Sequence, residues 1–247
     1  MFASGIAVDC GASLIVAKGG DLAQQGDGTD VSWPGDEKNR VVGKQHLAPN
    51  IKIGMRMPSF QVLKQADARP SQFQELLKSN GRWRIVVFAG DLRDPNQWTR
   101  ITRLGDTLAH LTSFLSRYDG KSSPHSVIEL LTIHSSPSTS VELLDLPAIF
   151  HPFSDRDGWD YWKVFVDDLS YHEGHGHAYG NYGVDLPKRA VSWWSGLMSQ
   201  YVAWVGGVGG HEGDGEGFHR VHARAGACVD GGWGQRGLRW GEIVSRG

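Results

Sequence analysis

The densest group of side chains able to bind a metal or move a proton lies in a glycine-rich stretch near the last third of the chain. It consists of His172, Glu173, His175 and His177. Imidazole and carboxylate groups are ligands for zinc and other transition metals. The spacing is not His-Glu-x-x-His, and the neighbouring glycines leave no regular helical face to align the ligands. A turn whose imidazoles bond backbone groups or face solvent is therefore the default interpretation, and a metal site is kept as the alternative.

Other catalytic patterns are missing from the sequence. The two cysteines, Cys10 and Cys228, form no Cys-x-x-Cys pair, zinc-ligand spacing or disulfide framework. No Gly-x-Ser-x-Gly elbow, Walker loop or dinucleotide fingerprint after a predicted strand is present. Residues 64–70 would suit an anion at a helix N-terminus or, by default, a loop held by Asp67 and Arg69. We predict no catalytic and no cofactor-binding residue in this chain.

The elements that would position any site follow from the apolar spacing. Ile85–Ala89 is a run of β-branched and aromatic residues, apolar on both faces, as in a central buried strand. Asp94 then suits a helix N-cap, Pro95 the first helical position, and Gln97 completes a capping-box pattern. Apolar residues at spacings of three and four predict one helix over 95–118. Its buried side chains are expected to be Trp98, Leu104, Leu108, Leu111 and Leu115.

Shorter patterns complete the predicted fold. We expect strands over 51–58, 61–64, 126–134 and 161–166, a short helix over 70–78, and further strands near Val191 and over 200–205. A buried strand, a capped helix and another strand form a βαβ unit, to which the later strands add as a hairpin. The predicted fold class is α/β, a thioredoxin-like fold. It lacks the CxxC redox motif, because the loop after the central strand, residues 88–95, holds no cysteine.

The two ends of the chain differ from its centre and predict irregular extensions. Residues 18–50 are polar and rich in turn signals, as in a linker or long surface loop. Glycine accounts for 33 of the 247 residues, and 14 of these lie in 203–247. No hydrophobic period survives there, so we expect residues 207–247 to be a disordered glycine-rich tail. Its Gly, Ala, Arg and Trp content is typical of GC-rich DNA translated in a shifted frame.

Overall charge excludes some classes of partner. Lys and Arg number 25 and Asp and Glu 27, a formal net charge of −2. This argues against a basic nucleic-acid binder and against a polybasic membrane face. The longest apolar runs fall far short of the roughly 20 residues that a membrane span needs. The first ten residues carry no positive side chain, so a signal peptide is not expected and the predicted location is cytoplasmic.

Several strings, in order along the chain, resemble one enzyme family. They are residues 2–8, 62–70, 82–91, 159–168 with its continuation to 185, and 200–206. Together they closely resemble the C-terminal domain of flavin-dependent phenol 2-monooxygenases, the phenol hydroxylases. The resemblance implies a thioredoxin-like domain without redox cysteines that contributes to homodimerisation. It also implies a parent enzyme that hydroxylates phenols with FAD, NADPH and oxygen, whose flavin and substrate domains lie upstream.

On this resemblance, residues 1–17 correspond to the end of the catalytic region, 18–50 to a linker and 51–206 to the dimerisation domain. The chain is then expected to be a C-terminal fragment or a truncated gene model. The sequence departs from the pattern of this family at two places. His177 takes the place of an acidic residue, and residues 192–199 replace a valine-rich strand, so the last strand pair is expected to be damaged.

Three hypotheses about function remain. The first is a non-catalytic dimerisation domain of a flavin monooxygenase, supported by the ordered motifs and the missing cysteines. The second is a stand-alone redox-inactive thioredoxin-like binding module. The third is a metal protein that uses the histidine cluster.

Overall fold

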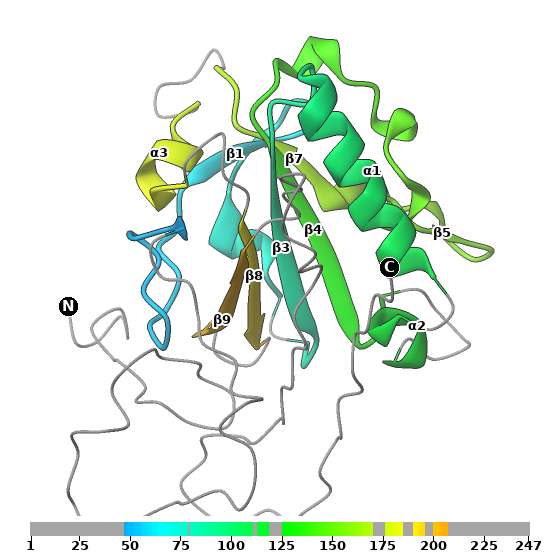
Figure 1. The fold of residues 1–247 in the computed structure, drawn as a ribbon, viewed down its shortest axis with the longest axis horizontal. Helices are drawn as coiled ribbons and strands as arrows, with labels where there is room; N and C mark the ends of the chain where they lie inside the picture. The colour runs from blue at the N-terminus through cyan, green and yellow to red at the C-terminus, as the bar shows by residue number, and fades with distance from the viewer. Residues whose placement is uncertain are drawn as a thin grey trace, which may run out of the picture.

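A computed structural model of the chain describes residues 47–78, 80–110, 113–118, 125–169 and 176–184, and the backbone of 190–195 and 200–206. The strands of its main sheet are β1 (Gln61–Lys64), β2 (Pro70–Gln72), β3 (Trp83–Gly90), β4 (Ile128–His134), β7 (Val164–Val166), β8 (Ala190–Ser195) and β9 (Gln200–Gly206). A small hairpin consists of β5 (Phe153–Ser154) and β6 (Gly158–Trp159). The helices are α1 (Pro95–Ala109), α2 (Phe114–Tyr118) and α3 (Ala178–Tyr182) (Figure 1).

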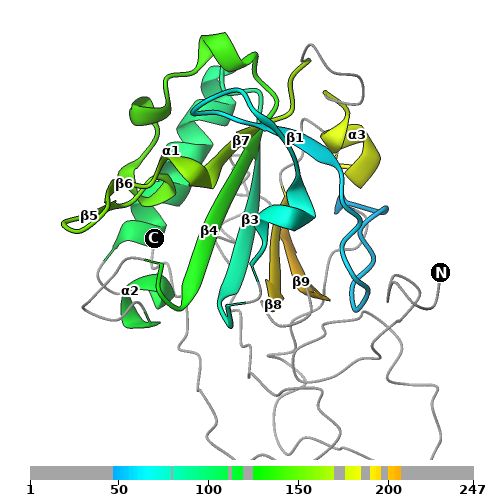
Figure 2. The same cartoon turned by 180° about the vertical axis from the view of Figure 1, so that it is seen from behind.

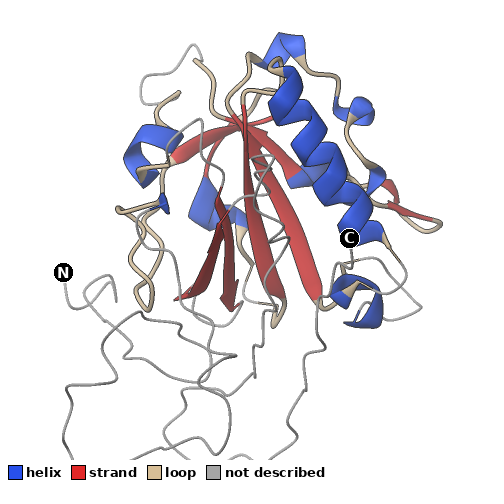
Figure 3. Cartoon of the chain, viewed as in Figure 1, coloured by secondary structure: helices blue, strands red, loops and turns tan. Residues whose placement is uncertain are grey.

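The main sheet, drawn in red in Figure 3, has the strand order β2-β1-β7-β4-β3-β8-β9. β3, β4 and β7 run parallel, while β1 pairs antiparallel with β7 and β8 pairs antiparallel with β3. The segment β3-α1-β4 is the predicted βαβ unit, and β8-β9 is the predicted hairpin. Together they have the order and directions of a thioredoxin-like fold, so the predicted fold class is confirmed.

Central strand β3 is buried on both of its faces, as its sequence predicts. Ile85, Val87 and Ala89 belong to one hydrophobic cluster, together with Ile101, Leu104 and Leu108 of α1. Val86 and Phe88 belong to the second cluster, with Phe73, Phe165 and the tyrosines of α3. α1 therefore covers one face of the sheet, and the other is covered by segments before β3 together with α3 (Figure 2). This second cluster includes Leu47 and Ala48, which lie within the predicted linker.

The long crossover from β4 to β7 packs on α1 at a glycine. A Cβ atom added to Gly105 would lie 2.6 Å from Cβ of Pro147 and 3.2 Å from Cε2 of Phe150. Since real Cβ atoms do not approach that closely, only glycine fits this helix position. The close approach fixes the crossover against the helix.

A group of charged side chains is buried at the amino end of the parallel strands. Nε of Arg84 donates to Oε2 of Glu129 at 2.6 Å, and Nζ of Lys163 bonds the other carboxylate oxygen. The Arg84 side chain is 1% exposed, and its Nη2 also donates to the carbonyl of Lys78 at 2.5 Å. Burial raises the pKa of Glu129, but Lys163 and Arg84 together bring it below its usual value. The carboxylate is thus held ionised between two cations.

The predicted helix over 95–118 is wrong in its second half. α1 starts as expected, with the Asp94 carboxylate accepting from the amide of Asn96, but it ends at Ala109. Ser113 lies between the two helices: its hydroxyl donates to the carbonyl of Leu108 and accepts from the amide of Ser116 in α2. The backbone amide of Asp94 donates to the carbonyl of Asp91, so the predicted capping box with Gln97 is replaced by a turn. Leu104, Leu108 and Leu115 are buried, Trp98 is half-buried, and Leu111 lies outside the described residues.

Three further predicted elements are also corrected. Residues 70–78 form strand β2 and a 3₁₀ turn instead of a helix, because residues 70–72 pair with β1. Residues 51–58 form turns with an isolated bridge instead of a strand. Residues 161–163 form a 3₁₀ turn, capped by the Asp160 carboxylate, before β7 begins. The strand pair expected to be damaged is formed: β8 pairs with both β3 and β9.

Candidate functional site

The carboxyl edge of the sheet is where a thioredoxin-like enzyme would carry its dithiol, in the loop between the central strand and its helix. Here the loop from Gly90 to Asp94 contains no cysteine. Arg93 instead forms an ion pair with Asp91, with Nη2 2.7 Å from Oδ2. The hydrogen bond from Arg93 lowers the pKa of Asp91 to about 2. This loop offers a salt bridge and a helix cap, and no thiol nucleophile.

A tyrosine hydroxyl occupies the space beside that loop. The hydroxyl of Tyr179 accepts from the backbone amide of Gly90 at 2.8 Å and donates to the carbonyl of Ile133 at 2.7 Å. It therefore joins β3 and β4 where their register shifts. The Asp167 carboxylate holds this tyrosine in place, because it accepts from the amides of Ala178 and Tyr179 at 2.8 Å each. Both hydroxyl bonds go to the protein's own backbone, so the group is structural.

His134 and Gln65 form a second polar link at this edge. Nε2 of Gln65 donates to the carbonyls of Ser138 and Val141 at 2.8 Å each. Its amide oxygen therefore faces His134, whose Nε2 lies 3.0 Å away and must carry the proton. Burial lowers the pKa of His134 to about 4, so the ring is neutral at neutral pH. The pair fixes the start of the β4–β7 crossover to β1.

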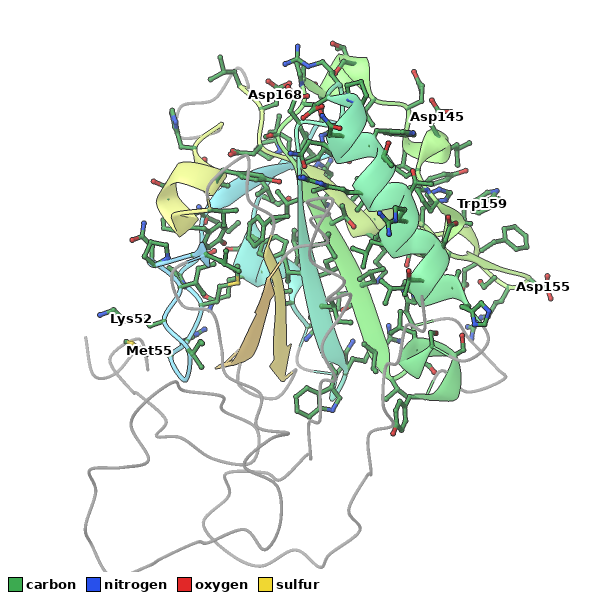
Figure 4. All side chains as sticks on the ribbon, viewed as in Figure 1. Lys52, Met55, Asp145, Asp155, Trp159 and Asp168 are labelled. Atoms are coloured by element: carbon green, nitrogen blue, oxygen red, sulfur yellow. The ribbon has the colours of Figure 1, made fainter. Side chains whose placement is uncertain are left out.

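The crossover between β4 and β7 presents a cluster of exposed apolar side chains, which we call the aromatic surface. Its members are Leu144, Phe153, Trp159, Tyr161 and Trp162, which are 57%, 49%, 39%, 38% and 53% exposed. Leu169 is the sixth large apolar side chain exposed within the described residues, and it lies outside this segment. Figure 4 shows Asp145, Trp159 and Asp155 along one flank of the molecule. A hollow of about 410 Å³ beside Gln65 and Tyr161 adjoins this surface.

Of the four predicted metal ligands, the structure describes only His177. His172, Glu173 and His175 lie outside the described residues, as do Cys10 and Cys228. His177 is exposed at the start of α3, and its side chain makes no capping bond there. Within the described ranges no three His, Cys, Asp or Glu side chains are grouped to hold a metal ion. In the same part of the chain, no helix has the length and apolar character to cross a bilayer.

Residues 64–70 form the turn between β1 and β2, not the start of a helix. The amide of Lys64 donates to the carbonyl of Arg69 at 3.0 Å, and the amide of Arg69 donates to the Asp67 carboxylate at 3.0 Å. The anion site considered at a helix N-terminus therefore has no helix behind it. The default interpretation, a loop held by its own polar groups, is confirmed.

Comparison with known proteins assigns the family. The sequence profile of the phenol hydroxylase C-terminal dimerisation domain matches residues 8–212. This chain belongs to that family. The phenol 2-monooxygenase fsqG of Aspergillus fumigatus is 44% identical over 138 residues, which is 56% of this chain and 22% of the relative. The FAD-dependent monooxygenase terD of Aspergillus terreus is 36% identical over 171 residues, 68% of this chain and 28% of the relative.

The chain thus spans roughly a quarter of the length of these FAD-dependent relatives. Among solved structures, a peroxiredoxin-like protein from Aquifex aeolicus superposes with a TM-score of 0.40 and 12% identity. That alignment covers 64% of this chain and 78% of the other. The likeness is too distant to support an inference about function.

Sequence reasoning missed both Tyr179 and the aromatic surface. Tyr179 is ordinary in sequence, and its hydrogen-bond partners lie 89 and 46 positions away. The surface residues share no period of two or 3.6, which is why pattern reading did not group them. One signal was available: Trp159, Tyr161 and Trp162 fall within four residues, directly before a strand.

Proposed function

We propose that this chain is the homodimerisation domain of an FAD-dependent monooxygenase that hydroxylates phenols with NADPH and oxygen. The observation that supports it is the family match over residues 8–212, together with relatives named as a phenol 2-monooxygenase and an FAD-dependent monooxygenase. In this proposal residues 51–206 form the dimerising unit and residues 1–17 the end of the catalytic region. FAD, NADPH and the phenol bind the remainder of the parent enzyme.

The carboxyl edge of the sheet supports a non-catalytic role. Two polar groups at this edge, the Tyr179 hydroxyl and the Gln65 amide, bond the protein's own backbone. A site that binds substrate needs donors or acceptors left available to the ligand. These two groups are engaged in contacts that hold the loops, which supports the proposed non-catalytic role.

Two measurements on the purified 247-residue chain test this function. Sedimentation equilibrium should give a dimer mass, with dissociation on dilution. Absorbance between 350 and 500 nm, in the flavin range, should show no stoichiometric FAD, and phenol should not stimulate NADPH consumption. A monomer at every concentration would contradict the dimerisation proposal. Bound flavin with phenol-dependent NADPH oxidation would contradict the non-catalytic role.

A further inference from the structure

From the position and chemistry of the aromatic surface, we infer that a second copy of this chain docks there. The inference rests on the proposed dimerisation and names the surface responsible for it. Five of the six large apolar side chains exposed in the described residues lie between residues 144 and 162. Aromatic residues are enriched at the centres of protein interfaces. Their concentration within residues 144–162 favours a docking site over scattered surface residues.

Two of these side chains, Phe153 and Trp159, are held by contacts within the domain before any partner binds. Phe153 and Trp159 face each other across the β5–β6 pair, with ring centroids 5.2 Å apart in an edge-to-face arrangement. The Trp159 ring also lies 5.2 Å from that of buried His151, whose Nε2 donates to the carbonyl of Leu146 at 2.8 Å. The amide of Asp160 donates to the carbonyl of Pro152 at 2.9 Å and closes the base of the hairpin.

The crossover that carries these side chains also packs on the body of the domain. The Gly105–Pro147 approach fixes the crossover to α1, as described above. At the opposite end of the surface, Nζ of Lys64 lies 5.0 Å from the centroid of the Trp162 ring. Docking on such a surface orders few side chains, so little conformational entropy is lost.

The charges around the surface suit a second copy in particular. The β5–β6 turn carries Asp155 and Asp157, both exposed, with Arg156 between them. The end near the sheet carries the Lys64 ammonium over Trp162. In a two-fold dimer each contact occurs twice, with the acidic end of one copy against the basic end of the other. Arg156 lies 3.7 Å from the Asp157 carboxylate, so one net negative charge of the turn would meet Lys64 of the other copy at each end of the apolar centre.

The test compares dimer dissociation constants of variants in the full 247-residue chain by sedimentation equilibrium. Phe153→Ser and Trp162→Ser should each raise the dissociation constant by at least about tenfold, as expected for interface aromatics. Leu169→Ser is the matched control, since this side chain is 75% exposed and lies outside the surface. It should leave the dissociation constant within about twofold of the wild type. Circular dichroism melting checks that each variant is folded.

A charge exchange gives a second, independent arm. Lys64→Glu should weaken the dimer, and combining it with Asp155→Lys and Asp157→Lys should restore at least half of the loss in binding free energy. A wild-type dimer that is unaffected by both serine variants and by Lys64→Glu would overturn the inference while leaving dimerisation intact; the surface would then face another part of the parent enzyme. A monomeric wild type would overturn the inference and the proposed function together.

Discussion

The two ends of the central strands both bury polar groups, but they use different chemistry. At the amino end, Glu129 lies between the cations Arg84 and Lys163. At the carboxyl end, the bonds of Tyr179 and of the His134–Gln65 pair are made by neutral groups. The amino end therefore depends on charge neutralisation, whereas the carboxyl end depends on pairing backbone groups with side chains.

The carboxyl end of the central strands differs here from that of a thioredoxin-like enzyme with thiol chemistry. In a thioredoxin-like enzyme the carboxyl edge needs an accessible thiol, and therefore an open loop. Here the Tyr179 hydroxyl and the Asp91–Arg93 pair occupy that edge. The side chains suited to binding lie on the β4–β7 crossover instead. The loop that would carry the thiol in such an enzyme holds an ion pair here, and a tyrosine hydroxyl bonds its first residue.

The largest effect is expected from the amino end. Glu129→Ala leaves Arg84 and Lys163 without their shared anion, and breaking a buried pair typically costs about 3–5 kcal/mol of unfolding free energy. Urea denaturation measures it. Glu75→Ala, at an exposed site, is the control and should change stability by less than about 0.5 kcal/mol. A loss below about 1 kcal/mol for Glu129→Ala would show that the buried ion pairs contribute little to the stability of the amino end.

Lowering the pH should reduce the free energy of unfolding, because each end of the central strands contains one buried histidine. At the amino end, burial lowers the pKa of His125 to about 4, and the nearby Lys163 ammonium also lowers it. At the carboxyl end, burial lowers the pKa of His134 to about 4. Glu129, Asp160 and Arg82 also act on His125, and Asp168 and Asp91 on His134. Between pH 6.5 and 4 the unfolded chain binds more protons, so stability falls as pH falls, by up to about 3 kcal/mol per histidine.

Urea titrations at pH 7.5, 6, 5 and 4.5 measure this slope. His134→Gln should reduce the pH dependence of the unfolding free energy by the contribution of the carboxyl end. His125→Gln should reduce it by the contribution of the amino end. A stability that is constant from pH 7.5 to 4.5 would show that both rings are solvated in the native state.

At the carboxyl end, Tyr179→Phe removes the hydroxyl that pairs Gly90 with Ile133. Two buried backbone groups lose their partner, so we expect a loss of about 1–3 kcal/mol. Tyr182→Phe on the same short helix is a close control, because its buried hydroxyl does not bridge β3 and β4. That change should stay within about 0.5 kcal/mol of the wild type. Equal losses in the two variants would contradict the bridging role of Tyr179.

The smallest effect concerns the start of α1 at the same edge. Asp94→Ala removes the carboxylate that accepts from the Asn96 amide and should cost about 1 kcal/mol by thermal unfolding. Asp94→Asn keeps a side-chain acceptor and should retain most of the stability. If the two variants lose the same amount, the charge of Asp94 matters more than its capping bond.

The elements that sequence reasoning predicted well are those encoded by neighbouring residues. The apolar run Ile85–Ala89 forms β3, and Asp94 with Pro95 begins α1. The errors arose where specific hydrogen bonds override the general helix preference of a segment. Residues 70–72 form a strand because β1 pairs with them, and the predicted long helix breaks because Ser113 bonds both Leu108 and Ser116. For the candidate site, the sequence predicted the missing dithiol and not the Tyr179 bridge that takes its place.

By itself, the sequence determined that the central strand is buried, where its helix begins, and that no cysteine follows that strand. These properties depend on residue types within a few positions of each other. Only the tertiary structure decided that Glu129 meets Arg84, 45 positions away, and Lys163, 34 positions away. It also decided that Phe153 and Trp162 stay exposed while Phe150 is buried. The reason is that sheet register and the packing of the crossover on α1 determine which side chains meet, and both depend on contacts between segments far apart in the chain.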